Sequence, residues 1–189
     1  MTERDVLILN AAEAVFSRYG VSKTTMHDIA VAAGVSRQTL YNAYPNKKEI
    51  LRATFRMGAA KIMAAVEEKW DQQQHLAEKL DTFFELGPLA LYDVIQSSPE
   101  AADLIDGINT IAHDELIELS KIWIKMFEAA ISAHIPPDSP SRFNINELAD
   151  FVYFSSLNAK YYAANRHVLS SRLQILKASV LSMLENPAV

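Results

Sequence analysis

The sequence predicts an all-α fold of about nine helices, and three observations support this prediction. Between only five glycines and seven prolines lie long stretches rich in Ala, Leu, Glu, Lys, Ile and Met, most of which favour helix. Apolar residues recur in these stretches at helical spacing. No Asn-Gly or Asp-Gly pair separates two alternating apolar runs, and the Asp-Gly pair at residues 106–107 lies in a helical pattern.

The first two helices have clear end signals. The first is predicted from about residue 3 to 19, because apolar residues recur at helical spacing and Gly20 follows where a left-handed cap belongs. The second begins at Thr25, which forms a capping-box pattern with Asp28, and it stops at Gly34.

The third and fourth helices begin at residues that favour N-caps. Ser36 starts the third helix, which ends before Pro45. Asn46 starts the fourth, with Glu49 in the matching box position, and this helix continues toward Trp70. It is long enough to join the N-terminal part to the remainder, so we expect the two parts to be mechanically coupled.

The remaining helices are predicted from prolines, glycines and apolar spacing. A fifth covers about residues 75–97 and is expected to bend at Gly87-Pro88. A short sixth follows Ser98-Pro99, because proline is favoured at the first helical position. The seventh, at about 109–134, is apolar on more than one side and should be central. A loop at 136–141 and two last helices, at about 144–165 and 168–185, complete the chain.

Composition excludes several classes of protein. The 189-residue chain has no cysteine, which excludes disulfides, Cys-ligated zinc, iron–sulfur clusters and thiol redox sensing. No stretch reaches the ~18 consecutive apolar residues that span a bilayer. The charged N-terminus leads into no signal-type apolar core, so we expect a cytoplasmic protein with no membrane partner.

Charge is distributed unevenly along the chain. The net charge is −5, but residues 1–57 carry eight Lys or Arg and five acids, a net of +3, and the rest carries −8. A basic segment before an acidic remainder indicates that only the N-terminal part meets a polyanion. A chance imbalance on solvated helix faces explains the same numbers equally well.

The second and third helices, with the tight turn between them, form a helix-turn-helix pattern at about residues 25–44. Gly34 supplies a turn conformation that a Cβ resists, and Ser36 caps the third helix so that its positive end can face a phosphate. The side chains left exposed on this helix can bond to base edges or phosphates, and none is acidic. They are Arg37, Gln38, Thr39, Tyr41 and Asn42.

At these residues the sequence resembles the TetR family of bacterial transcriptional regulators, over about a quarter of the chain, from Ile8 to Leu51. The resemblance rests on many positions at fixed spacing. They are Ala11-Ala12, Val15-Phe16, Tyr19-Gly20, Thr24-Thr25-Met26, Ile29-Ala30, Ala33-Gly34-Val35-Ser36, Thr39-Leu40-Tyr41, Tyr44 and Lys47-Lys48-Glu49-Ile50-Leu51. It implies a helix-turn-helix DNA-binding domain at residues 1–48 and a helical domain for ligand binding and dimerisation at 49–189.

The resemblance also implies roles for single residues in DNA binding. Thr24 and Thr25 resemble family residues that contact DNA phosphates. Lys47, at the start of the fourth helix, resembles a family residue that binds a phosphate. The set facing the bases, behind the cap Ser36, is Arg37, Gln38, Thr39 and Asn42. Tyr41 and Tyr44 contact the DNA backbone or pack, and Arg37 favours phosphate over guanine because backbone contacts outnumber base contacts.

The sequence departs from the family pattern at two of these positions. Gln38 stands where the family often has Gly or Ala, and it adds an amide fork that favours adenine. Ala43 replaces a frequent His, which removes one possible phosphate contact. Both departures make the operator sequence impossible to predict.

The last two helices carry apolar stripes that are typical of self-association. Either the two stripes form a four-helix seam with a second copy, as the resemblance favours, or they only cover the core of one chain. A two-fold dimer would present two recognition helices to a palindrome. The stripe residues are Leu148, Val152, Ser155, Ala159 and Tyr162 on one helix and Leu169, Leu173, Leu176, Val180 and Leu184 on the other.

The remainder of the chain is rich in aromatic side chains, most of which should be ordinary core. Together with the resemblance, they favour a largely apolar effector pocket. The candidate lining residues, from the fifth and seventh helices, are Phe84, Tyr92, Trp123 and Phe127. The histidines show no metal-ligand spacing, so we expect neither a metal nor another cofactor.

These observations predict a homodimeric repressor that binds a palindromic operator in double-stranded DNA and is released by a small, largely apolar effector of unknown identity. Displacement of the fourth helix would couple the two events. The alternative is an effector-independent, DNA-bound adaptor that recruits another protein. An enzyme is not expected, because the sequence has no glycine-rich phosphate loop, no His-Glu-x-x-His and no Gly-x-Ser-x-Gly.

Overall fold

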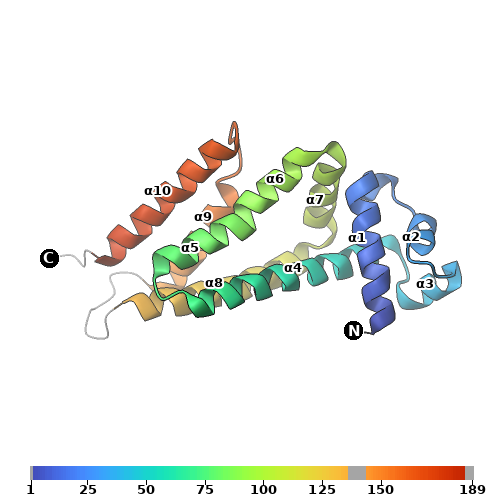
Figure 1. Ribbon diagram of the computed structural model, residues 1–189, viewed down its shortest axis with the longest axis horizontal. Coiled ribbons are helices and arrows are strands. Elements are labelled where there is room, and N and C mark those ends of the chain that lie inside the picture. Colours follow the sequence, from blue (N-terminus) through green and yellow to red (C-terminus); the bar gives the residue numbers. More distant parts are fainter. Residues whose placement is uncertain (1, 136–143, 186–189) are drawn as a thin grey trace. The chain divides into compact units, whose positions relative to one another are not determined.

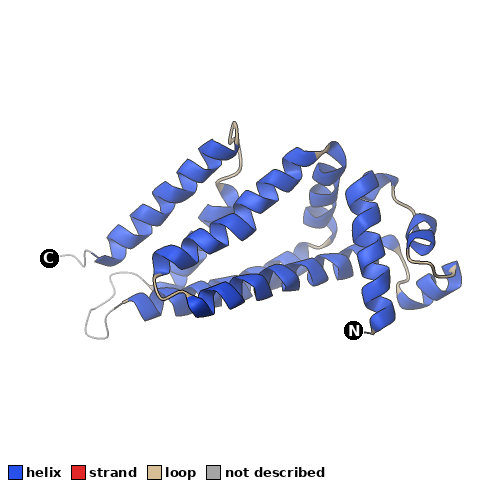
Figure 2. Ribbon diagram, in the orientation of Figure 1, coloured by secondary structure: helices blue, strands red, loops and turns tan. Residues whose placement is uncertain are grey.

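The computed structural model describes residues 2–135 and 144–185, and every regular element in those two ranges is helical (Figure 1, Figure 2). The predicted all-α fold is confirmed. None of the described helices is both long and apolar enough to cross a membrane. The elements are α1 (Glu3–Lys23), α2 (Met26–Ala32), α3 (Arg37–Ala43), α4 (Lys47–Gln72), α5 (Leu76–Phe84), the π-helical segment η1 (Glu85–Leu89), α6 (Ala90–Ser97), α7 (Pro99–Ile111), α8 (His113–His134), α9 (Ile145–Asn158) and α10 (Arg166–Glu185).

Cap geometry confirms most of the predicted helix starts. Thr25 and Asp28 form the capping box of α2, in which each side chain accepts a hydrogen bond from the other residue's backbone N–H. The Ser36 hydroxyl accepts from the third residue of α3, and the Asn46 side chain accepts from the third residue of α4. The predicted bend at Pro88 is a π-helical turn between α5 and α6, one of the usual causes of a kink.

Three predicted boundaries are wrong. The first helix, expected to end at about residue 19 with a left-handed cap at Gly20, continues to Lys23 across a kink, where Gly20 has φ 76° and ψ 168°. The helix expected from about 109 begins at His113, because α7 continues to Ile111 and Ala112 then leaves the helical conformation, with φ −105° and ψ 31°. The helix expected to reach about 165 ends at Asn158. The predicted loop at 136–141 lies outside the described residues.

The chain forms two compact units. We call Met1–Lys61 with Val94–Ile117 the head unit, and Ile62–Asp93 with Glu118–Val189 the body unit. Helix α4 contributes residues to both units. The functional division at residue 48 remains a prediction.

The head unit has its own apolar core. Helices α1 to α3 and the first turns of α4 enclose it, and α7 packs along α1. Phe16, Ile29, Leu40 and Ile50 are fully buried there, each removing enough apolar surface from water to contribute about 1.5–3 kcal/mol. The core therefore fixes α2 and α3 relative to α1.

The body unit is built around an aromatic cluster. Phe83 of α5 meets Trp123 and Phe127 of α8 edge to face, with ring centroids 5.0 and 4.8 Å apart. Trp70 of α4 also meets Phe127 edge to face, with ring centroids 5.4 Å apart. Leu148, Val152, Leu169, Leu173 and Val180 of α9 and α10 close the same core.

Two glycines of the head unit differ in what an added Cβ would meet, and this gives a first prediction. Gly20 has φ 76° and ψ 168°, a region that is essentially restricted to glycine, and its Cβ would lie 2.5 Å from Asp103 Oδ2. Gly34 has φ 64° and open space around it. We expect Gly34→Ala to cost about 1–2 kcal/mol of unfolding free energy and Gly20→Ala about 2–4 kcal/mol. Urea denaturation measures both, and equal losses would contradict the packing at Gly20.

Candidate nucleic-acid interface

The turn between α2 and α3 is fixed by backbone hydrogen bonds. Val35 N–H donates to Ala30 O at 3.0 Å and Gly34 N–H donates to Val31 O at 3.1 Å, which is a Schellman motif with glycine in the left-handed position. Leu40, the buried residue of α3, anchors that helix in the core. The turn and the anchor together set the direction of α3.

The outer face of α3 is polar and carries no acid. Arg37, Gln38, Tyr41 and Asn42 are exposed there, and Thr39 is half-buried. Gln38 Nε2 donates to Asn42 Oδ1 at 2.8 Å, one helical turn away. This bond holds the two amides in one arrangement and leaves the Gln38 carbonyl and the Asn42 amino group for base edges.

Other side chains that were predicted to contact DNA form hydrogen bonds or pack within the head unit. Arg37 Nε donates to His27 Nδ1 at 3.2 Å. The Thr25 hydroxyl donates to Asp28 at 2.6 Å, and this bond lowers the pKa of the Asp28 carboxyl. The Ser36 hydroxyl lies 2.8 Å from that of Thr39. Tyr44 is half-buried against the core, and its burial raises the pKa of its hydroxyl.

Thr24 and Lys47 have structural roles that the sequence did not indicate. Thr24 is buried, and its hydroxyl donates to Gly20 O at 2.6 Å. Lys47 Nζ donates to Val21 O at 2.6 Å and to Thr24 O at 2.7 Å. Lys47 therefore satisfies two carbonyls that α1 leaves without helical partners. Its predicted phosphate contact remains a prediction.

Helix α7 also stabilises the end of α1, through Asp103 and Ser22. The Ser22 backbone N–H and hydroxyl both donate to Asp103 at 2.9 Å, which lowers the pKa of that carboxyl. Because the folded pKa lies below its usual value, this stabilisation is present at neutral pH and is lost as the pH falls through the folded value. No sequence signal links residues that lie so far apart in the chain.

A half-buried ion pair joins α4 to the first turn of α8 within the head unit. Arg52 Nη1 lies 3.1 Å from Glu115 Oε2, and Arg56 Nη1 lies 3.7 Å from the other oxygen. The Glu115 side chain is 13% exposed. Two arginines thus share one carboxylate, and their charge is partly neutralised.

The contacts of Lys47 give a second prediction. Lys47→Met leaves the carbonyls of Val21 and Thr24 without their charged donor, so we expect a loss of about 1.5–3 kcal/mol in unfolding free energy. Lys48 is exposed and makes no hydrogen bond or ion pair within the described residues, so Lys48→Met is the matched control. Urea denaturation of the two variants decides, and equal stabilities would contradict a structural role for Lys47.

The structure separates the predicted interface residues of α9 and α10 into two groups. Leu148, Val152, Leu169, Leu173 and Val180 are buried in the core of the chain itself, so they offer no surface to a second copy. The regular spacing of these apolar residues is explained by their packing in the core of the same chain. Ser155, Leu176 and Leu184 are half-buried.

Two more of the predicted interface residues lie after the end of α9. Ala159 is half-buried, and Tyr162 is 98% exposed with φ 58°. Arg172 donates to the carbonyls of Ala159 and Tyr161, both at 2.8 Å, and so holds this turn.

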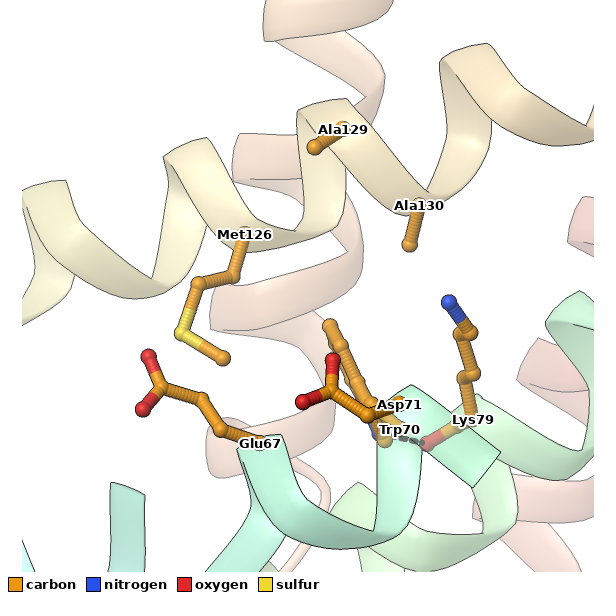
Figure 3. Close-up of a pocket in the computed structure, with 7 residues that line it drawn as sticks. All are labelled: Glu67, Trp70, Asp71, Lys79, Met126, Ala129 and Ala130. Carbon is orange, nitrogen blue, oxygen red and sulfur yellow. Dashed lines mark hydrogen bonds between the residues drawn. The ribbon is translucent and has the colours of Figure 1, made fainter. Parts of the chain in front are cut away.

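The predicted pocket residues belong to the packed core of the body unit. Phe84, Tyr92, Trp123 and Phe127 are all buried, which is the alternative that the sequence left open. A pocket of about 280 Å³ lies elsewhere in this unit, and none of the four lines it. Its lining residues are Glu67, Trp70, Asp71, Lys79, Met126, Ala129 and Ala130 (Figure 3). That the four aromatic residues line an effector site remains a prediction.

Within the described residues there is no group of three or more His, Asp or Glu side chains that could hold a metal ion. The candidate interface on α3, which Ser36 caps, presents hydroxyl, amide and guanidinium groups. Such groups can bind phosphates and base edges without a metal.

Comparisons with known proteins agree on one family. The family model for bacterial regulatory proteins of the tetR family matches residues 8–54. An uncharacterised HTH-type transcriptional regulator, YezE of Bacillus subtilis, is 30% identical over 112 residues, which cover 57% of this chain and 55% of that protein. A probable acrEF/envCD operon repressor of Escherichia coli is 32% identical over 80 residues, which cover 42% and 30%. The chain spans about half or less of the length of the curated relatives it matches.

The likeness in structure extends over nearly the whole chain. A TetR-family transcriptional regulator of Pectobacterium atrosepticum has a TM-score of 0.75 at 18% sequence identity, with 98% of this chain and 96% of that one covered. At this level of identity the likeness shows the fold alone.

Proposed function

Because the chain belongs to the TetR family of bacterial regulatory proteins, we propose that it is a DNA-binding transcriptional repressor. It reads a palindromic operator as a homodimer and leaves the operator when a small molecule binds the body unit. The observation that carries the proposal is the outer face of α3, whose exposed side chains are polar and include no acid.

The reading of bases follows from how α3 is held. Ser36 caps its N-terminus, Leu40 seats it in the core, and the turn at Gly34 fixes its approach. Gln38 and Asn42 then face the major groove as a bonded pair. Together they offer one carbonyl acceptor, from Gln38, and one amino donor, from Asn42, which match the N6 donor and N7 acceptor of an adenine. The terminal guanidinium nitrogens of Arg37 contact a phosphate and set the register of the protein on the duplex.

Self-association is supported by the outer faces of α9 and α10. Phe151 and Phe154 on α9 are 50% and 42% exposed, and Ile175 and Met183 on α10 are 64% and 41% exposed. Large apolar side chains left exposed on two helices that contact each other are typical of a protein interface. This face replaces the buried stripe as the proposed seam, and a two-fold axis through it would pair two copies of α3.

Release by an effector needs a connection between the two units, and α4 supplies one. It is continuous from Lys47 to Gln72 and contributes to both. Its first residue, Lys47, bonds the carbonyls that precede α2. A ligand that favours one position of α4 therefore shifts the population of DNA-binding conformations, and a few kcal/mol of difference is enough.

Selection of bound fragments from random duplex DNA at low ionic strength tests the proposed function. The expected result is enrichment of a two-fold symmetric site, with half-sites about one helical turn or more apart. Failure to enrich any sequence would overturn the proposal. Enrichment of an asymmetric site would contradict the dimer.

A further inference from the structure

The pocket of the body unit that Figure 3 shows has an acidic side and an aromatic wall. Glu67 and Asp71 lie one turn apart on α4, and their side chains extend towards α8, from which Met126, Ala129 and Ala130 line the opposite side. The two alanines occupy little space. The pocket therefore combines room for a small molecule with two carboxylates at its edge.

The two carboxylates have no cation of their own. Within the described residues neither Glu67 nor Asp71 makes an ion pair or a hydrogen bond, although Lys79 lines the same pocket. The Lys79 ammonium instead lies 5.8 Å from the centroid of the Trp70 ring. Two negative charges and one weakly placed positive charge leave the pocket attractive to a further cation.

The aromatic wall is held in place. Trp70 is 6% exposed, its Nε1–H donates to Lys79 O at 2.9 Å, and its ring meets Phe127 edge to face. The indole therefore cannot rotate away when a ligand enters. An indole face attracts cations through its quadrupole, and the neighbouring thioether of Met126 adapts to an apolar ligand.

We propose that this pocket binds an organic cation with an apolar body, such as a quaternary ammonium or a protonated amine. Its charge faces Glu67 and Asp71, and its apolar part lies between Trp70 and Met126. Anions are repelled by the carboxylates. A hydrated metal ion gains little from an indole and a thioether, which are poor partners for hard cations. As the effector class of a repressor, this assignment rests on the proposed function, whereas the binding site itself does not.

The test is calorimetric titration of the full chain with two isosteric probes, (3-hydroxyphenyl)trimethylammonium and 3-tert-butylphenol, which differ only in the charged nitrogen. We expect the cation to bind at least about tenfold more tightly. The double variant Glu67→Gln and Asp71→Asn should lose that preference, and Lys79→Met should strengthen cation binding about three- to tenfold by removing the competing ammonium. Glu68→Gln, an exposed neighbour outside the pocket, should bind as the unaltered chain does.

Equal affinities for the two probes, or undiminished cation binding by the double variant, would overturn the site. Both substitutions replace exposed acids with isosteric amides, so we expect the variant to fold, and circular dichroism checks this. Operator affinity measured in the same samples separates the two levels of the proposal. Cation binding that leaves DNA affinity unchanged would overturn only the assignment as effector, and a chain that binds the cation but no DNA would overturn the proposed repressor.

Discussion

Replacing Leu40 with alanine is expected to lower the unfolding free energy of the protein by about 2–5 kcal/mol and to reduce its affinity for DNA. Leu40 is fully buried and is the buried residue of the seven-residue helix α3. Its side chain fixes the position of α3 in the head unit, so a cavity there loosens the helix that carries Gln38 and Asn42. Urea denaturation and fluorescence anisotropy with a labelled operator measure the two effects.

Leu7→Ala is the matched control, because Leu7 lies on α1 in the same unit and is 52% exposed. This variant should change stability by less than about 0.5 kcal/mol. If Leu40→Ala proved as stable as Leu7→Ala, or kept its full affinity for DNA, the seating of α3 described above would be wrong.

Replacing Ile175 with glutamate is expected to convert the proposed dimer to monomers at micromolar concentration. The side chain is 64% exposed on α10, and in the proposed seam a charge there would face apolar surface or its own symmetry mate. Because a two-fold interface contains each residue twice, a cost of about 3 kcal/mol weakens self-association at least about 100-fold. Sedimentation velocity reads the change, and operator affinity should fall with it.

Ile122→Glu controls for a new charge on an exposed isoleucine. Ile122 is 45% exposed on α8, in the same unit but outside α9 and α10. It should leave the sedimentation coefficient unchanged. A dimeric Ile175→Glu protein would place the seam on another surface.

The fold could be predicted from the sequence at positions where residues close in the chain determine the local structure. Caps are such places, because Thr25 with Asp28, or Ser36 alone, satisfies backbone groups within the next three residues. The end of α9 is different. It is followed by a turn whose carbonyls meet Arg172 of α10, and the segment from 159 to 165 contains neither glycine nor proline.

The site could be predicted in part. The polar face of α3 follows from helical spacing alone, because Leu40 must turn inward. Periodicity does not distinguish a stripe that packs on its own core from one that packs on a second copy, so Leu169 and Leu173 fitted both readings until their burial was known. The partners of Lys47, Asp103 and Glu115 depend on the packing of α1, α4, α7 and α8, which no local pattern specifies.

The reading of bases by α3 is tested most directly by comparing Asn42→Ala with the unaltered protein, on the selected operator and on single-base variants of it. The variant should lose about 1–3 kcal/mol on the operator and should discriminate less at one base pair in each half-site. An equal loss on every sequence, with discrimination intact at all positions, would show that Asn42 contacts only the DNA backbone and would contradict the account.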